Sequence, residues 1–250
     1  PLFRDASVLQ TERHLSRLIE RQPDEYLRWV SAQYEILSRK PAVDSVLRHT
    51  LATETVPDGL VCEYGVATGN SVNAIARALA PRTVYGFDTF EGLPNDWVVG
   101  DITIPKGTIA IDMKKLDSEP NVKLFKGLFS ESLPPFMAAH TGPMGFLHVD
   151  CDTYHSTIDI FANTGAHIQE GTLIVFDEIL GDVGLENELR VLWEFSKRTG
   201  LGFEWLSSGK HCWTADTQKD FMKKRKFAPL TDLKLLFKNA RVLTSMRKVE

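Results

Sequence analysis

The stretch LVCEYGVATGN, from Leu60 to Asn70, decides the fold. It predicts a buried strand that ends at Glu63, followed by a turn that contains Gly65 and Gly69. Residues 71–79 then carry apolar side chains at helical spacing. A strand, a glycine turn and a helix bring backbone N–H groups and a helix N-terminus against a nucleotide-like ligand. The spacing is neither Gly-x-Gly-x-x-Gly nor that of a P-loop, so an ordinary strand-to-helix turn is the alternative.

Strands and helices alternate outward from this unit. Further strands are predicted at residues 83–88, 122–126, 145–150, 172–176, 202–206 and 211–214. The link between the last two is short enough for an antiparallel hairpin. We therefore expect an α/β fold with a doubly wound, seven-stranded, mostly parallel sheet and an antiparallel last strand.

The segments on either side of the sheet differ in character. Residues 1–56 predict helices at 11–19 and 25–37 and a third that Pro41 opens, and these would form a cover or lid. Residues 57–215 would form the core domain, in which 95–120 look irregular. Residues 216–250 carry ten Lys or Arg against four Asp or Glu and predict a basic extension outside the sheet, with a helix at 230–237.

Composition excludes several classes of protein. The chain has 250 residues, 43% hydrophobic residues and a net charge of −4, which fits a globular domain and argues against a nucleic-acid partner. Three cysteines without a CxxC pair predict buried free thiols in a reducing compartment. No apolar run approaches a membrane span and no signal peptide is evident, so the expected location is the cytoplasm. The chain starts at Pro1 without Met, which leaves open that it is cut from a longer protein.

An acid at the end of the second strand points to a nucleoside. Asp88 follows Gly69 by 19 residues. At that spacing a carboxylate can accept hydrogen bonds from ribose hydroxyls of a nucleoside bound over the first turn. Phe90 in the following loop is placed to cover a base.

Acids also end the fourth and fifth strands. Asp150, Asp152, Asp177 and Glu178 converge on one rim if these two strands are neighbours. Crowded carboxylates repel one another unless a cation or protons intervene. Oxygen ligands on rigid strand ends suit Mg²⁺ or another hard divalent ion.

Each of these residues also has a structural interpretation. Glu63 would order the glycine turn by accepting backbone N–H bonds, and Asp88 would cap a loop. Asp152 would be the N-cap of the helix that follows it. His148 and His155 would be packing residues.

Five motifs, taken together and in order, carry a family resemblance. They are EYGVATG (63–69), GFDTFEGLP (86–94), GLFS with Leu133-Pro134 (127–134), DCDTY with Ser156-Thr157 (150–157), and Gly171-Thr172 leading to Asp177-Glu178. The chain resembles the class I S-adenosylmethionine-dependent methyltransferases. Within them it is similar to the metal-dependent sugar and natural-product O-methyltransferases of the macrocin O-methyltransferase type.

The resemblance implies a role for each motif. Asp150, Asp177 and Glu178 would ligate Mg²⁺, although the family has Asp-Asp where this chain has Asp-Glu, which puts direct ligation by Glu178 in question. Asp152 would be the general base, with His155 as a second candidate. Contacts to S-adenosylmethionine would come from Glu63, Gly65, Ala67, Gly69, Ser71, Asp88, Thr89, Phe90, Gly127, Leu128, Phe129 and Asp150.

The expected function is a Mg²⁺-dependent O-methyltransferase for a hydroxylated small molecule, such as a sugar or a glycosylated natural product. Coordination lowers the pKa of the acceptor hydroxyl, a carboxylate takes its proton, and the oxygen attacks the sulfonium methyl in line. The alternatives are a metal-independent small-molecule methyltransferase and a cofactor-binding domain without catalysis. Residues 1–50 and 95–120 would choose the acceptor, and a homo-oligomer is a further expectation.

Overall fold

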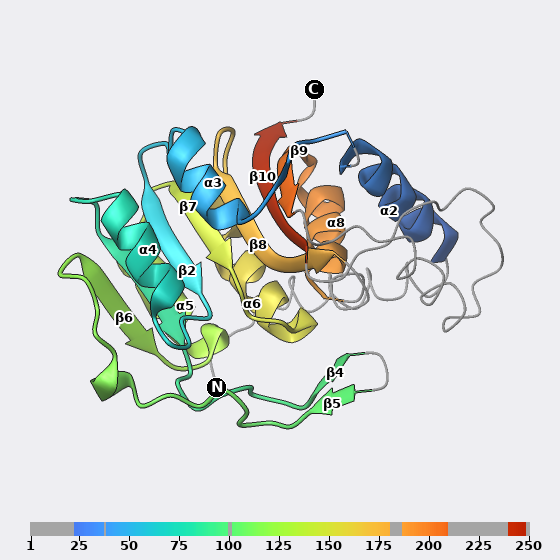
Figure 1. The fold of residues 1–250 in the computed structure, drawn as a ribbon. Coiled ribbons are helices and arrows are strands. Elements are labelled where there is room, and N and C mark those ends of the chain that lie inside the picture. The colour runs from blue at the N-terminus through green and yellow to red at the C-terminus, as the bar shows by residue number, and fades with distance from the viewer. Residues whose placement is uncertain (1–22, 38, 100–101, 181–186, 210–239, 249–250) are drawn as a thin grey trace.

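A twisted eight-stranded sheet forms the centre of the computed structural model, which describes residues 23–37, 39–99, 102–180, 187–209 and 240–248 (Figure 1). The strand order is β1-β9-β10-β8-β7-β2-β3-β6. The strands are β1 (Ala42–Val43), β2 (Leu60–Tyr64), β3 (Val84–Asp88), β6 (Val122–Lys126), β7 (Met144–Val149), β8 (Leu173–Leu180), β9 (Leu201–Gly209) and β10 (Ala240–Lys248). Neighbours run parallel except at β10, which is antiparallel to both β8 and β9. The predicted α/β fold with a mostly parallel, doubly wound sheet is confirmed.

Helices cover both faces of this sheet. On one face lie α3 (Val46–Thr53) and α4 (Asn70–Ala78), and on the other lie α5 (Phe129–Ala139), α6 (Tyr154–Thr164) and α8 (Glu188–Thr199) (Figure 1). The predicted helix at 25–37 is present as α2 (Pro23–Leu37), where Tyr26 packs against Trp193 of α8 with ring centroids 5.2 Å apart. Two short 3-10 helices complete the list: η1 (Met113–Lys115) and η2 (Gly165–His167).

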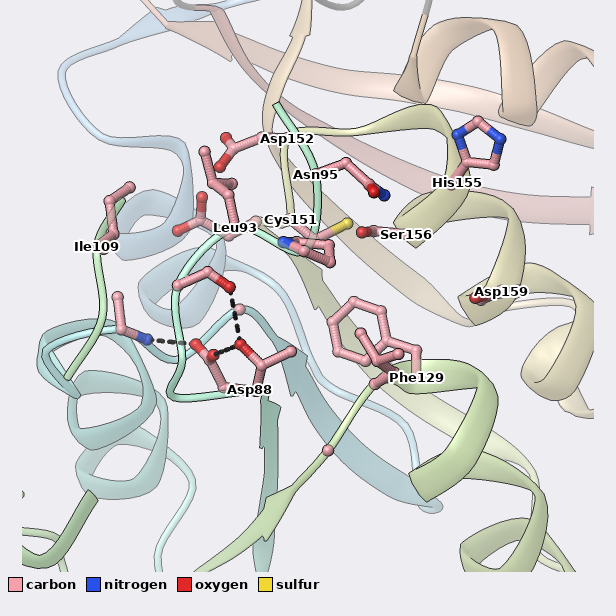
Figure 2. A pocket seen from close by; sticks show the side chains of 18 of the residues that line it. Asp88, Leu93, Asn95, Ile109, Phe129, Cys151, Asp152, His155, Ser156 and Asp159 are labelled. Atoms are coloured by element: carbon pink, nitrogen blue, oxygen red, sulfur yellow. Dashed lines mark hydrogen bonds between the residues drawn. The ribbon is translucent and has the colours of Figure 1, made fainter. Parts of the chain in front are cut away.

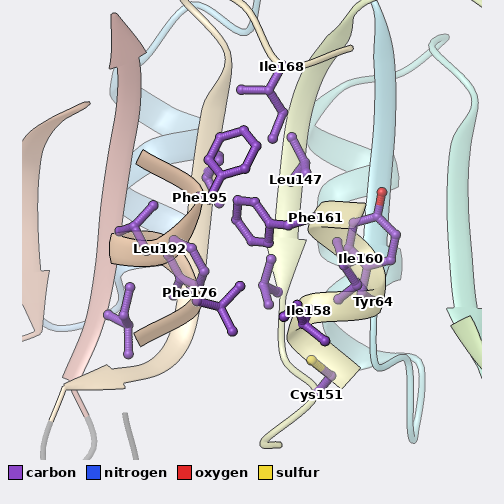
Figure 3. Packing of buried hydrophobic residues seen from close by; sticks show 14 of the residues in the cluster. Tyr64, Leu147, Cys151, Ile158, Ile160, Phe161, Ile168, Phe176, Leu192 and Phe195 are labelled. Atoms are coloured by element: carbon purple, nitrogen blue, oxygen red, sulfur yellow. The ribbon is translucent and has the colours of Figure 1, made fainter. Parts of the chain in front are cut away.

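The central strands are buried on both faces, which explains their apolar sequences. All six residues of β7 are buried. Aromatic rings fill the space between β8 and the helices: Phe161 of α6 is stacked with Phe176 at 6.3 Å, and meets Phe195 of α8 at 5.0 Å (Figure 3). This rigid packing fixes the strand ends that form the site.

The position of the antiparallel strand is the main difference from the predicted topology. Residues 216–250 were expected to form an extension outside the sheet, which is wrong for residues 240–248, because they form β10 inside it. The sequence did not predict this strand, because basic residues flank it and both of its pairing partners are far away in the sequence. The expected strand at 211–214 and the helices expected at 11–19 and 230–237 lie outside the described residues.

Three further segments differ from expectation. Pro41 does not open a helix. The short strand β1, which was not predicted, follows it, and α3 starts later, at Val46, with Ser45 as its N-cap. Strand β8 continues past residue 176 to Leu180, so Asp177 and Glu178 lie within the strand. The region 95–120 is not wholly irregular, since β4 (Trp97–Val99) and β5 (Ile102–Ile104) pair as a separate antiparallel hairpin (Figure 1).

Candidate active site

A cavity of about 500 Å³ opens at the carboxyl ends of the parallel strands, where ligands bind in open α/β sheets (Figure 2). The glycine turn after β2, the loops after β3 and β6, and the segment between β7 and α6 all contribute to its wall. Ten of the predicted site residues line it: Gly65, Ala67, Asp88, Thr89, Gly127, Leu128, Phe129, Asp150, Asp152 and His155. Figure 2 shows Asp88 on the opposite side of the cavity from Asp152 and His155.

The Asp88 carboxylate fastens the glycine turn to the end of β3. Its Oδ2 accepts the backbone N–H groups of Val66 at 2.9 Å and Ala67 at 2.8 Å, and its Oδ1 accepts that of Phe90 at 2.7 Å. Three charge-assisted bonds of this kind fix both loops on this side of the cavity. Asp88 thus has the structural role considered for it, since it holds a loop. Because Asp88 also lines the cavity, it can contact a ligand as well.

We expect Asp88→Asn to lower the free energy of unfolding by about 1–3 kcal/mol, because an amide NH₂ would face N–H donors that now meet a carboxylate oxygen. Cofactor affinity should fall by about tenfold or more through the loosened turn. Denaturant unfolding and calorimetric titration with S-adenosylhomocysteine measure the two effects.

Asp112→Asn is the matched control, because Asp112 is exposed and accepts one backbone N–H, from Lys114 at 3.1 Å. It should leave the cofactor affinity unchanged. An Asp88→Asn protein with native affinity and stability would contradict the role of this carboxylate in holding the turn.

Glu63 does not order the turn, although that interpretation was open for it. It is fully buried, and its Oε1 lies 2.7 Å from Nδ1 of His148 on the neighbouring strand. The other two polar atoms of this pair, Glu63 Oε2 and His148 Nε2, are buried and have no hydrogen-bond partner among the described residues. Burial lowers the pKa of His148, but the hydrogen bond and charge of Glu63 and the charges of Asp150 and Asp177 raise it overall. Glu63 and His148 therefore form a buried polar pair across β2 and β7, and His148 lies two residues before Asp150.

Asp150 directly follows β7 and Asp177 lies within the neighbouring parallel strand β8, and the two come close together, as predicted. One carboxylate oxygen of each and one ring nitrogen of His148 all lie within 4.8 Å of one another. Burial and repulsion from Asp177 raise the pKa of Asp150 to about 7. Carboxylates held at this separation fit a divalent cation, which would relieve their repulsion. The side chain of Glu178 is outside the described part of the chain.

Asp152 lies in a tight turn between β7 and α6. Its φ of +64° is in the left-handed region, which Asp and Asn tolerate better than other side chains. The N-cap of α6 is Thr153, whose hydroxyl accepts the N–H of Ser156, so the N-cap interpretation of Asp152 is wrong. Asn187 fixes the same turn by accepting the backbone N–H of Tyr154 at 2.8 Å. Asp152 therefore lies on a firmly held turn, and His155 lies in the first turn of the helix that follows it.

Four of the predicted cofactor contacts do not line the cavity, and buried Glu63 is one of them. Gly69 and Ser71 lie at the start of α4, where Gly69 is the N-cap. Phe90 was expected to cover a base, but its side chain is buried in the hydrophobic cluster on the α3–α4 face of the sheet. Phe129 does reach the cavity, and its ring packs edge-on against Tyr64 at 5.8 Å.

Several lining residues were missed at the sequence level. On α6, Ser156 and Asp159 follow Asp152 at the spacing of one helix face, a signal that was available. Asn95, Lys106 and Ile109 lie in the segment that was expected to choose the acceptor, but no motif singles them out.

The comparisons with known proteins agree with this geometry. The sequence model of the family described as "methyltransferase domain" matches residues 62–179. A curated relative from Streptomyces olivaceus, an 8-demethyl-8-(2,3-dimethoxy-alpha-L-rhamnosyl)-tetracenomycin-C 4'-O-methyltransferase, is 27% identical over 149 residues. That match covers 52% of this chain and 56% of the relative, so the chain spans only about half the length of the curated relative.

One solved structure shows a similar fold. The O-methyltransferase NovP aligns with a TM-score of 0.50 at 18% identity, covering 81% of this chain and 76% of that one. The calicheamicin methyltransferase CalS11 aligns with a TM-score of 0.48 at 16% identity, covering 80% and 86%. Among the described residues, no helix combines the length and apolarity needed to cross a bilayer. Residues 62–179, a little under half of the chain, match the methyltransferase domain family, and the mostly parallel sheet and the glycine turn agree with that match.

Proposed function

We propose that the protein is an S-adenosylmethionine-dependent O-methyltransferase whose acceptor is a hydroxyl group of a small molecule. The observation that carries the proposal is the two-sided cavity. One side presents a glycine turn fastened by Asp88, and the other presents Asp152 and His155 (Figure 2). A nucleoside cofactor suits the first side and proton abstraction from a hydroxyl suits the second.

The cofactor side is formed by main chain and small residues. Gly65 and Ala67 would lie against the methionine part, and Asp88 at the cavity edge would accept ribose hydroxyls with lone pairs that its backbone bonds leave open. Leu128, which is 39% exposed, and Phe129 would flank the adenine. S-adenosylmethionine supplies an electrophilic methyl group on sulfur.

The acceptor side would orient the hydroxyl and remove its proton. Asp150 and Asp177 would hold a divalent cation such as Mg²⁺, with Glu178 as a third candidate ligand. A bound divalent cation lowers the pKa of a coordinated hydroxyl. The carboxylate of Asp152 would accept the proton. His155, in the first turn of α6, also lines the cavity and is the second candidate for that role.

The acceptor itself is proposed to be a sugar or a glycosylated natural product. The curated relative acts on a rhamnosyl group of a tetracenomycin by its name. In this chain the lining residues Asn95, Lys106 and Ile109 come from the segment around the β4–β5 hairpin. They would determine which acceptor fits.

Asp152→Asn is expected to reduce methyl transfer by about 10²-fold or more, since the amide cannot take a proton, while cofactor affinity stays within about twofold of wild type. Asn is the right replacement because it tolerates the left-handed backbone at this position. Transfer of a labelled methyl group to a panel of glycosides and phenols measures the turnover, and calorimetry measures binding.

The same assay separates the alternatives. Turnover that survives EDTA would favour a metal-independent methyltransferase. Cofactor binding without turnover on any acceptor of the panel would favour a binding domain that does not catalyse. An Asp152→Asn protein with full activity would overturn the role of Asp152 as general base.

A further inference from the structure

His148 is an ionisable residue in a strand that is otherwise apolar. It is 1% exposed and lies in β7, whose other side chains are apolar. Burying an imidazole in an apolar strand costs free energy unless its nitrogens are engaged. Only one of them is, since Nδ1 contacts Glu63 and Nε2 has no hydrogen-bond partner in the part of the chain that the structure describes.

The register of the strands places His148 beside the acid pair. Parallel pairing sets Val149 opposite Phe176, so Asp150 and Asp177 follow on adjacent strands. His148 precedes Asp150 by two residues and shares its face of the sheet. The ring nitrogen and the two carboxylate oxygens within 4.8 Å of one another are thus contributed by three side chains on one face.

Glu63 holds the ring in the orientation that a metal ligand needs. Histidines that bind metals commonly donate their other ring N–H to a carboxylate, which fixes the tautomer and directs the free nitrogen to the ion. Here Glu63 Oε1 lies 2.7 Å from Nδ1, so the nitrogen left to face a cation is Nε2. A histidine needed only for packing would not require a fully buried carboxylate beside it.

We infer that His148 Nε2 is a direct ligand of the divalent cation, together with Asp150 and Asp177. The inference rests on the proposed function in one respect, which is that both place a cation at Asp150 and Asp177. One imidazole nitrogen with two carboxylates is a mixed site, and imidazole favours transition metals whereas Mg²⁺ prefers oxygen ligands. The site should therefore select Mn²⁺, Fe²⁺ or Co²⁺ over Mg²⁺.

The test is electron spin-echo spectroscopy of the protein loaded with Mn²⁺ alone, without methyl donor or acceptor. The expected spectrum contains ¹⁴N modulation from a directly bound imidazole, which changes to that of ¹⁵N when the wild-type protein is labelled with ¹⁵N-histidine. The signal should be lost in His148→Gln and kept in His155→Gln, which removes the histidine on the cavity wall. Bound Mn²⁺ without nitrogen modulation in the wild type, or modulation that survives in His148→Gln, would overturn the inference, as would failure to bind Mn²⁺ at all.

A second measurement compares the affinities of the protein for Mn²⁺ and Mg²⁺. His148→Gln should weaken Mn²⁺ binding by about tenfold or more and Mg²⁺ binding by much less, so that the ratio of the two dissociation constants narrows. Equal losses for both ions would contradict ligation by nitrogen. Because neither measurement requires methyl transfer, a protein that binds Mn²⁺ through His148 but transfers no methyl group would refute the proposed function and leave this inference standing.

Discussion

Gly65→Ala is expected to reduce cofactor binding below detection and to destabilise the fold. A Cβ at this position would lie 1.8 Å from the carbonyl oxygen of Asp150, far inside van der Waals contact, and the φ of +94° is one that side chains rarely adopt. The conformational strain alone costs about 1–2 kcal/mol. The clash adds to it, and relieving the clash requires the glycine turn to move away from the end of β7. Calorimetric titration with S-adenosylhomocysteine and thermal unfolding give the two readouts.

Gly171→Ala is the control that separates backbone strain at a positive φ from the steric clash of an added Cβ. Gly171 has a similar φ of +87°, but an added Cβ there meets nothing within 4 Å, and the residue is not part of the cavity wall. We expect this control to lose about 1–2 kcal/mol of stability and to bind cofactor as the wild type does. If Gly65→Ala bound cofactor with native affinity, the glycine turn would not be the cofactor site.

Asp150→Asn is expected to abolish function while stabilising the protein in the absence of metal. Removing one charged ligand should weaken divalent-cation binding and the proposed methyl transfer by about 10²-fold or more. At the same time the variant removes the repulsion between Asp150 and Asp177, which together with burial raises the pKa of Asp150 from 3.8 to about 7. Because the charged form is disfavoured in the folded state, the metal-free variant should gain about 1–2 kcal/mol at pH 8.

The pH dependence has a definite sign. A carboxyl group whose pKa is raised on folding does not destabilise the folded state below its ordinary pKa. The destabilisation grows as the pH rises from about 4 to 7 and is constant above pH 7. The gain from Asp150→Asn should therefore be near zero at pH 4 and complete above pH 7, measured as midpoints of thermal unfolding in EDTA. Asp58→Asn, at an exposed position in the turn before β2, should show no such trend. A stabilising effect that is equal at pH 4 and pH 8 would exclude electrostatic repulsion as its cause.

Local patterns predicted most of the parallel sheet and the rim of acids. The strand that ends at Glu63, the glycine turn and α4 follow from residues close together in sequence, so periodicity and turn chemistry suffice to find them. The convergence of Asp150 and Asp177 follows from a general rule of parallel sheets, which places strand ends on one edge. Neither prediction needed the orientation of a side chain.

The orientation of side chains is where sequence reasoning fell short. Asp88 is the last residue of β3 and Glu63 is the last but one of β2, and nothing local tells which of them accepts N–H groups from the glycine turn. In the structure Asp88 does so, whereas Glu63 is directed to His148 on β7, a contact between residues 85 apart. Phe90 likewise faces the core because a positive φ of +56° reverses the chain at that residue. These outcomes depend on tertiary geometry.

Strand β10 failed to be predicted for a related reason. It pairs with β8 and β9 at once, and both partners are distant in sequence. The β4–β5 hairpin was missed although Gly100-Asp101 between two apolar runs is a turn signal.

The place of β10 also has a consequence for the order of assembly during translation. Among the residues that the structure describes, β8 and β9 do not pair with each other, and β10 lies between them. Residues 210–239 separate β9 from β10 along the chain. On the ribosome the edge of β8 and the β9–β1 pair must therefore wait, unpaired, until residues 240–248 have emerged. An open sheet edge is a ready template for intermolecular association. The nascent protein is thus most exposed to aggregation, and most dependent on chaperones, in that interval.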